Sequence, residues 1–157
     1  MSDPTGPSLP DFSSLDRGQV SYLPVVPGRL EFATEVRRRI LADRPDIVAV
    51  ELPQTLEDVY LDAVRRLPQI SVIFYNDTSL APGPAYPRQP DEDRAVYVPV
   101  EPADPFVEAV RTANEIGAGV IFADPDAVER PHIPGVYPDS FALQSIEYQQ
   151  YIEAYRL

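Results

Sequence analysis

Amphipathic stretches alternate with short apolar runs along most of this chain. In these stretches, apolar side chains recur every three or four residues, which is the spacing of a helix with one buried face. The spacing predicts helices over residues 30–43, 56–67 and 105–116. Thr55 is a candidate N-cap for the second helix, with Asp58 three residues later. Pro45 and Pro68 are expected to end the first two helices, because the residue before a proline is pushed out of the helical region.

The third helix carries the clearest boundary signals. Asp104 is the expected N-cap, because its carboxylate can accept hydrogen bonds from the N–H groups of the first turn. Pro105 would occupy the first helical position, where an N–H has no partner within the helix. Gly117 is the expected C-cap, since glycine readily adopts the left-handed conformation that ends many helices.

The apolar runs between the helices are short and rich in β-branched residues, which is typical of strands. They predict strands at residues 20–26, 47–52, 70–75, 95–100 and 119–123. The run at 47–52 is almost continuously apolar, as in a strand that is covered on both faces. Strands that alternate with helices indicate right-handed crossovers. We therefore predict a single α/β domain with a mainly parallel sheet of four to five strands and helices on both faces.

Three segments fall outside this regular alternation. Residues 1–18 lack periodicity and are predicted to be a flexible N-terminal tail, so that the α/β domain spans residues 19–157. Residues 76–94 are rich in proline and predict an excursion loop. A C-terminal helix is predicted over residues 141–157, with a broad apolar and aromatic face made of Leu143, Ile146, Tyr148, Tyr151, Ile152 and Tyr155.

This C-terminal helix stops in mid-pattern, without a C-cap. One hypothesis is that its apolar face packs on its own domain, as most aromatic stripes do. The other is that it binds a protein partner, or an additional domain of a longer chain that continues beyond Leu157. A second copy of the chain is one such partner, which would give a homodimer.

Composition and charge exclude several classes of function. The 25 acidic and 13 basic residues give a net charge of −12, which would repel a phosphate backbone and argues against nucleic-acid binding. The chain has no cysteine, so disulfides, thiolate metal sites and a cysteine nucleophile are excluded. No apolar run is long enough to cross a bilayer, and no secretory signal pattern opens the chain. These features favour a cytoplasmic protein that does not bind membranes.

Candidate chemistry lies where the predicted strands end, because ligands of open α/β sheets bind outside the carboxyl ends of the strands. Glu51 is the leading candidate, since it is a charge at the exit of an otherwise apolar run. We predict catalytic roles for Glu51 and Asp77, and binding roles for Arg29, Glu101, Asp124 and His132. Carboxylates that converge there would raise one another's pKa or hold a divalent cation, and no other cofactor is predicted.

Helix capping explains some of these acids in another way. Helix N-termini follow strands and favour negative side chains, which accounts for Asp104 and Asp124. Glu101 could simply be solvated. The run Arg37-Arg38-Arg39 is predicted to be a solvated helix face, whereas Arg29 lies near a helix N-terminus and is better placed to contact an anion.

Several segments resemble known sequences. The Arg-Pro-Asp helix end followed by Ile-Val-Ala-Val-Glu-Leu, at residues 44–52, resembles the opening of the TraB, Tiki and erythromycin-esterase-like superfamily. Residues 95–100, 104–110 and 117–124 are similar to the N-terminal domain of large bacterial proteins of that clan, so the resemblance covers residues 20–130. It implies an α/β fold and places Glu51 in the family's strand motif. Members proposed to be metal-dependent hydrolases carry a Gly-x-x-His motif after the first strand, and residues 25–30 have no histidine there.

Two functional hypotheses follow. The first, which we favour, is a non-catalytic or degenerate α/β domain of a bacterial protein that binds a partner or belongs to a larger chain. The second is a divergent metal-assisted hydrolase that uses Glu51 and neighbouring carboxylates at the carboxyl edge of the sheet.

Overall fold

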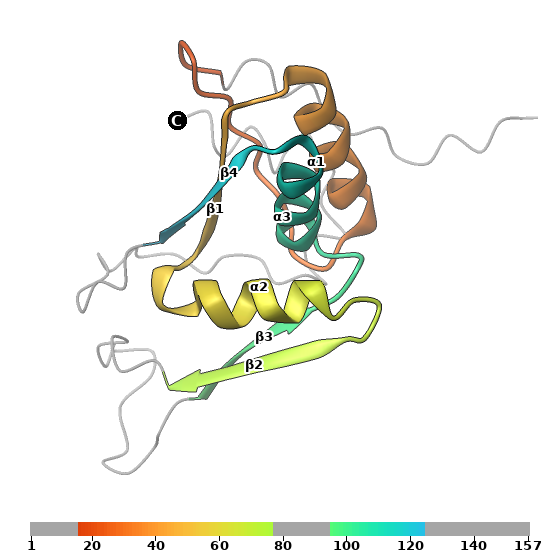
Figure 1. Cartoon of the computed structure of the whole chain (residues 1–157), viewed down its shortest axis with the longest axis vertical. Coiled ribbons are helices and arrows are strands. Elements are labelled where there is room, and N and C mark those ends of the chain that lie inside the picture. Colours follow the sequence, from red (N-terminus) through yellow and green to blue (C-terminus); the bar gives the residue numbers. More distant parts are fainter. Residues whose placement is uncertain (1–15, 77–94, 125–157) are drawn as a thin grey trace, which may run out of the picture.

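The computed structural model describes residues 16–76 and 95–124 (Figure 1). The mixed α/β class predicted from the sequence is confirmed, because helices and strands alternate along these residues. In chain order, the elements are α1 (Leu30–Asp43), β1 (Ile47–Pro53), the short 3-10 helix η2 (Gln54–Leu56), α2 (Glu57–Arg65), β2 (Ser71–Asn76), β3 (Ala95–Val100), α3 (Pro105–Ile116) and β4 (Gly119–Asp124).

The described strands form two separate pairs rather than one sheet. β1 pairs with β4 in parallel, as predicted, with Val50 opposite Phe122. β2 and β3 pair antiparallel, with Phe74 opposite Tyr97. A mainly parallel sheet of four to five strands is therefore not confirmed. The mainly parallel interpretation treated every helix as a crossover, but the connection from β2 to β3 reverses the chain direction instead.

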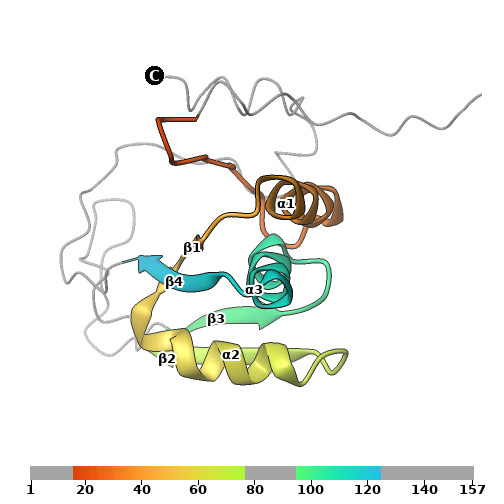
Figure 2. The same cartoon turned by 45° about the horizontal axis from the view of Figure 1, so that its top comes forward.

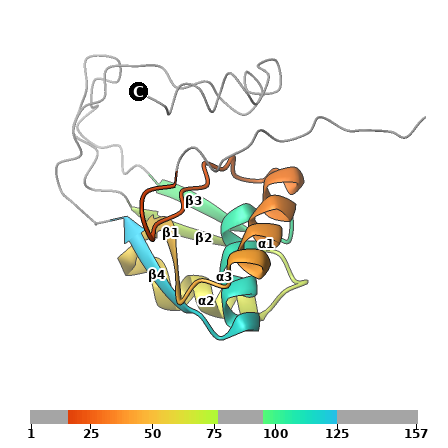
Figure 3. The same ribbon diagram turned by 90° about the horizontal axis from the view of Figure 1, so that it is seen from above.

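The helices form layers on one side of the parallel pair. α3 packs on both β1 and β4, and α1 packs on the outer side of α3 (Figures 2 and 3). α2 packs on α3 and on the β2–β3 pair. Helices on both faces of the parallel pair are not confirmed, because in the described part of the chain the second face of β1 and β4 is exposed at alternate positions.

Residues 20–26 do not form the strand that their apolar pattern predicts. The structure gives this stretch a single isolated bridge, between Arg17 and Val20, and no regular ladder. Pro24 interrupts the run and has no N–H to donate to a neighbouring strand. Val26 is nevertheless buried, so the run contributes to the core without joining a sheet.

The helix boundaries follow the predicted signals at α1 and α3 but not at α2. α1 spans the predicted residues, and α3 begins after the predicted cap Asp104 and ends at Gly117 in the left-handed conformation. α2 has Leu56 as its N-cap, because η2 precedes it, so the prediction that Thr55 caps this helix is wrong.

One hydrophobic core joins the two strand pairs and the helices. Tyr60 of α2 and Phe122 of β4 are both almost fully buried, and their rings meet edge to face with centroids 5.6 Å apart. Such a contact adds about 0.5–1.5 kcal/mol beyond the area it buries. This pair therefore fixes α2 against β4.

Three predictions concern residues outside the described ranges: most of the N-terminal tail, loop residues 77–94 and the helix over 141–157. None of the helices formed by residues 16–76 and 95–124 has the length and apolar character needed to span a membrane.

Candidate functional site

Glu51 and Asp124 lie at the same edge of the parallel pair, as the sequence predicted. The two strands run in the same direction, and Pro53 at the end of β1 is aligned with Asp124 at the end of β4. The register shifts between Val50 and Pro53, and Glu51 lies in this irregular stretch with its side chain exposed. A register shift at a strand end re-aims side chains, and such irregularities are common beside functional sites.

Arg29 and Glu101 lie at the N-termini of two helices. α1 and α3 each lead by a short loop into a strand and run antiparallel to it, so their N-termini lie at the same end of the domain as the carboxyl edge of β1 and β4 (Figure 1). Glu101 approaches Gly28, because a Cβ added at Gly28 would lie 3.5 Å from the Glu101 Oε1 atom. The sequence placed both residues at the correct end, although in different layers from Glu51.

Arg29 contacts an anion within its own helix. Its Nη2 atom lies 2.6 Å from the Oε1 atom of Glu31, and its Nε donates to the same oxygen at 2.9 Å. Both side chains are partly buried. The pair places a carboxylate in the first turn of α1, where negative charge is favourable, so an external anion would have to compete with Glu31.

Asp104 is the centre of the junction between these helices. Its Oδ1 atom accepts hydrogen bonds from the N–H groups of Phe106 and Val107, at 2.8 and 3.2 Å. Its Oδ2 atom accepts from the N–H of Gly28 at 3.0 Å, across 76 residues of sequence. Asp104 therefore caps α3 and also holds the loop that leads into α1, and the sequence had predicted only the first of these roles.

The pKa of the Asp104 carboxyl is subject to opposing effects. Burial raises the pKa of this carboxyl above its ordinary value, and the negative charge of Glu101 raises it further. The N–H groups of Val107, Gly28 and Phe106 oppose this change because they stabilise the carboxylate, but burial has the larger effect.

Tyr60 occupies the space beside this junction. Its ring contacts Phe122, and its side chain lies close enough to Asp104 for that carboxylate to influence its titration. Burial raises the pKa of the Tyr60 hydroxyl far above its ordinary value, and the nearby negative charge adds to the effect. Tyr60 is therefore neutral at physiological pH.

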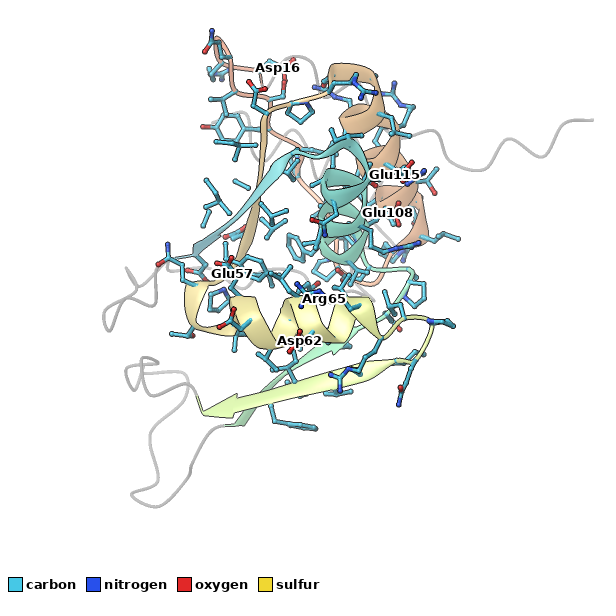
Figure 4. All side chains as sticks on the ribbon, in the orientation of Figure 1. Asp16, Glu57, Asp62, Arg65, Glu108 and Glu115 are labelled. Atoms are coloured by element: carbon cyan, nitrogen blue, oxygen red, sulfur yellow. The ribbon has the colours of Figure 1, made fainter. Side chains whose placement is uncertain are left out.

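A network of charged residues between α1 and α3 was not predicted. Arg37 donates to both carboxylate oxygens of Glu115, at 2.7 and 3.0 Å, and to Oε1 of Glu108 at 3.1 Å (Figure 4). Glu108 is only 8% exposed and also accepts from Thr112 at 3.0 Å and from Arg111 at 3.2 Å. Hydrogen bonds from Arg37 lower the pKa of Glu115. The Arg37 side chain is still 41% exposed, so it is solvated as predicted but also paired with α3. The predicted solvated face fails at Arg39, whose side chain is 16% exposed and pairs with Asp43 and Asp16.

The outer face of the β2–β3 pair exposes aromatic side chains. Phe74 is 71% exposed and Tyr97 is 69% exposed, although they lie directly opposite each other on the two strands. Val72 and Pro99, the pair two residues away, are exposed as well. The sequence carried no signal for this exposure, because both strands are almost continuously apolar rather than alternately apolar and polar.

Two candidate residues, Asp77 and His132, lie outside the residues that the structure describes. Within residues 16–76 and 95–124, no three histidine, aspartate or glutamate side chains gather in a group that could hold a metal ion. The roles predicted for Glu51, Asp77, Arg29, Glu101, Asp124 and His132 stay predictions.

Comparisons with known proteins identified no relative of this chain. The chain matches no protein family, no curated protein and no solved structure.

Proposed function

We propose that this chain is a non-catalytic α/β domain that binds a protein partner, alone or as part of a larger protein. The observation that carries the proposal is the cross-strand pair of exposed aromatic residues, Phe74 and Tyr97. Contiguous apolar patches of this kind on a protein surface mark interaction sites, and aromatic residues are enriched among those that dominate binding energy.

The aromatic patch lies on strands whose other face is packed in the hydrophobic core. Ile73 and Val100, on the opposite face of the two strands, are buried in the core. α2 packs on the same pair of strands, so the β2–β3 pair is held by tertiary contacts as well as by its own ladder. Phe74 and Tyr97 are therefore presented on a fixed surface, which reduces the entropy that is lost when a partner binds.

Charge indicates the class of partner. The whole chain carries a net charge of −12. The first turn of α2, which packs on the other face of the same two strands, adds Glu57 and Asp58. A chain with this charge attracts basic surfaces and repels acidic ones at long range. We therefore propose a basic protein surface with apolar side chains at its centre as the partner.

The test is a calorimetric titration of the full chain with a synthetic peptide of alternating lysine and phenylalanine. The peptide should bind the wild type, and the double variant Phe74→Thr/Tyr97→Thr should bind it at least about tenfold more weakly. Threonine suits a strand, so the variant should keep its fold. The matched control is Leu30→Thr/Leu41→Thr, which removes two exposed apolar side chains from α1.

Two results would contradict the proposal. One is equal binding of the peptide by the wild type and the Phe74/Tyr97 variant, and the other is equal loss in the α1 control. A peptide of alternating glutamate and phenylalanine should bind more weakly than the basic one, because the chain is acidic. Equal affinity for the two peptides would show that charge does not select the partner.

A metal-assisted hydrolase is the second candidate, and one observation favours it: exposed Glu51 lies at the same strand edge as Asp124. Carboxylate oxygens at one edge suit a hard divalent cation. The test is calorimetric titration of the wild type and Glu51→Gln with manganese, magnesium and zinc, with Asp62→Asn as a control on exposed helix surface. Binding that is lost only in Glu51→Gln would favour the hydrolase over the binding domain.

The kinship with the TraB, Tiki and erythromycin-esterase-like superfamily, a bacterial source and a cytoplasmic location stay predictions of the sequence. So do the roles of the C-terminal helix in binding a partner or a second copy of the chain. The proposed partner surface on β2 and β3 does not depend on any of them.

A further inference from the structure

The two outer edges of the β2–β3 pair differ in their capacity to form hydrogen bonds. In the described part of the chain these strands pair only with each other, so each has one edge that faces away from its partner. β3 contains Pro99, which has no N–H to donate to a strand placed beside it. β2 has the sequence Ser-Val-Ile-Phe-Tyr-Asn and contains neither a proline nor a charged residue.

The register of the two strands determines which backbone groups point outward. Pro99 is aligned with Val72 and cannot exchange two hydrogen bonds with it, so these residues form a non-hydrogen-bonded pair. The two kinds of pair alternate along an antiparallel ladder, so Phe74 and Tyr97 also form a non-hydrogen-bonded pair. Val72 and Phe74 therefore direct both their N–H and their C=O groups toward the outer edge of β2.

The outer edge of β2 lacks the devices that prevent edge-to-edge pairing. Natural edge strands are protected by prolines, charged side chains or bulges. Pro99 protects β3 in this way. β2 has no such residue, and its register with β3 runs without a shift from Ser71 to Asn76. This edge is therefore a regular template on which a further strand can form.

We propose that the partner adds an extended segment to the outer edge of β2 as a further strand. The inference rests on the proposed function, because such a strand would enlarge the face on which Phe74 and Tyr97 are exposed. In this mode of recognition, hydrogen bonds between main chains supply affinity and alternate side chains supply specificity.

The two faces of the added strand select different side chains. Successive side chains of a strand point to opposite faces, so apolar residues at alternate positions would continue the aromatic patch at Phe74. The intervening side chains would point to the side on which α2 lies, where Glu57 and Asp58 favour lysine or arginine. The net charge of −12 also repels a second copy of this chain, so a basic segment is the favoured occupant.

Backbone N-methylation of the peptide tests the inference without any change to the protein. The alternating lysine–phenylalanine peptide is prepared in two further forms, one N-methylated at every phenylalanine and the other at every lysine. Along an extended strand, the N–H groups of the phenylalanines point to one edge and those of the lysines to the other. Each form is the control for the other, because their side chains are identical and only the blocked edge differs.

Calorimetric titration of the full chain should distinguish the two methylated forms by at least about tenfold in affinity, because only one of them loses the bonds to β2. Loss in the phenylalanine form would indicate an antiparallel added strand, and loss in the lysine form a parallel one. Equal affinity of the two methylated forms would overturn the inference, while the proposed function would stand if the unmodified peptide still binds at Phe74 and Tyr97. Failure of the unmodified peptide to bind would overturn both.

Amide hydrogen exchange, followed by nuclear magnetic resonance, locates the added strand on the protein. With saturating unmodified peptide, exchange at the N–H groups of Val72 and Phe74 should slow at least about tenfold, because these groups gain partners. The N–H of Tyr97 points to the outer edge of β3 and should be unaffected. Equal protection of Tyr97, or protection of Val72 and Phe74 in a dimer that forms without peptide, would overturn the inference.

Discussion

Arg37 of α1 and Glu108 of α3 form an ion pair at 3.1 Å across the interface between the two helices. Glu108 is almost fully buried, and Thr112 donates its hydroxyl to the same Oε1 atom that Arg37 contacts. Arg111 reaches the other oxygen. Glu108 is therefore the point at which the charges between these helices converge, and its loss leaves several donors without their partner.

The first prediction is that Glu108→Ala destabilises the fold by about 1–3 kcal/mol. Thr112 is fully buried and would lose the acceptor of its hydroxyl, and a buried donor without a partner costs this much. Glu108→Gln should cost less, because an amide oxygen still accepts from Thr112. The free energy of unfolding is measured by urea denaturation, followed by circular dichroism.

Asp62→Ala is the control for loss of a charge in the Glu108 experiment. Asp62 forms an ion pair with Arg65 on the exposed surface of α2, and such pairs contribute about 0–1 kcal/mol (Figure 4). A loss in Glu108→Ala no greater than the loss in Asp62→Ala would show that the buried network contributes nothing to stability.

This network also shows a limit of reasoning from the sequence. Helical periodicity placed Arg37 on the polar side of α1, and that assignment holds for Arg38, which is exposed and pairs with Glu35 one turn away. The sequence could not show that α3 would pack against the flank of α1 that carries Arg37. Contacts between two helices depend on how they pack, and hydrophobic spacing within one helix does not specify this.

The second prediction concerns the pH dependence of stability at Asp104. Because burial raises the pKa of this carboxyl, the folded protein holds the proton to higher pH than the unfolded chain does. In the window that begins at about pH 4, where an unfolded aspartate titrates, the folded state binds more protons. The contribution of Asp104 to stability should therefore fall as pH rises through this window.

Asp104→Asn isolates this effect, because asparagine keeps an acceptor oxygen for the cap but does not ionise. We expect the unfolding free energy of the wild type, relative to this variant, to decrease as pH rises from about 4 toward the raised pKa. The measurement is a series of urea denaturations at closely spaced pH values. A relative gain by the wild type over the same interval would mean that the hydrogen bonds to the carboxylate outweigh burial.

Local signals predicted more of this fold than long-range ones. The cap at Asp104 and the end at Gly117 were predicted because capping depends on a few neighbouring residues. The second role of Asp104, its bond to the N–H of Gly28, depends on how two distant segments meet. In the same way, β2 and β3 were predicted as strands, but nothing in their apolar runs specified antiparallel pairing.

The same distinction between local and long-range signals applies to the candidate site. Strand order and direction brought Glu51 and Asp124 to one edge, as parallel pairing requires. The aromatic patch at Phe74 and Tyr97 was missed, because its exposure depends on which elements cover β2 and β3. Position along a strand is encoded locally, whereas the cover over a face is decided by the whole fold.

The third prediction concerns backbone strain at the C-terminal end of α1. Arg44 is the C-cap and adopts the left-handed conformation, with φ 45° and ψ 57°, while its N–H donates to the carbonyl of Ile40 at 2.9 Å. A side chain in this region costs about 1–2 kcal/mol that glycine avoids. Glycine also loses more entropy on folding, by about 0.5–1 kcal/mol. Arg44→Gly should therefore stabilise the protein by up to about 1 kcal/mol, and this would raise its melting temperature.

Arg66→Gly is the matched control for Arg44→Gly, since Arg66 caps the C-terminus of α2 in the ordinary right-handed region, with φ −83° and ψ −6°. There glycine relieves no strain and only adds entropy to the unfolded chain, so this variant should be destabilised by about 0.5–1 kcal/mol. Opposite signs in the two variants would establish that backbone conformation at Arg44, rather than loss of a positive charge, determines the effect. Destabilisation of similar size in both would show that Arg44 bears no strain, and that its side chain stabilises the end of α1.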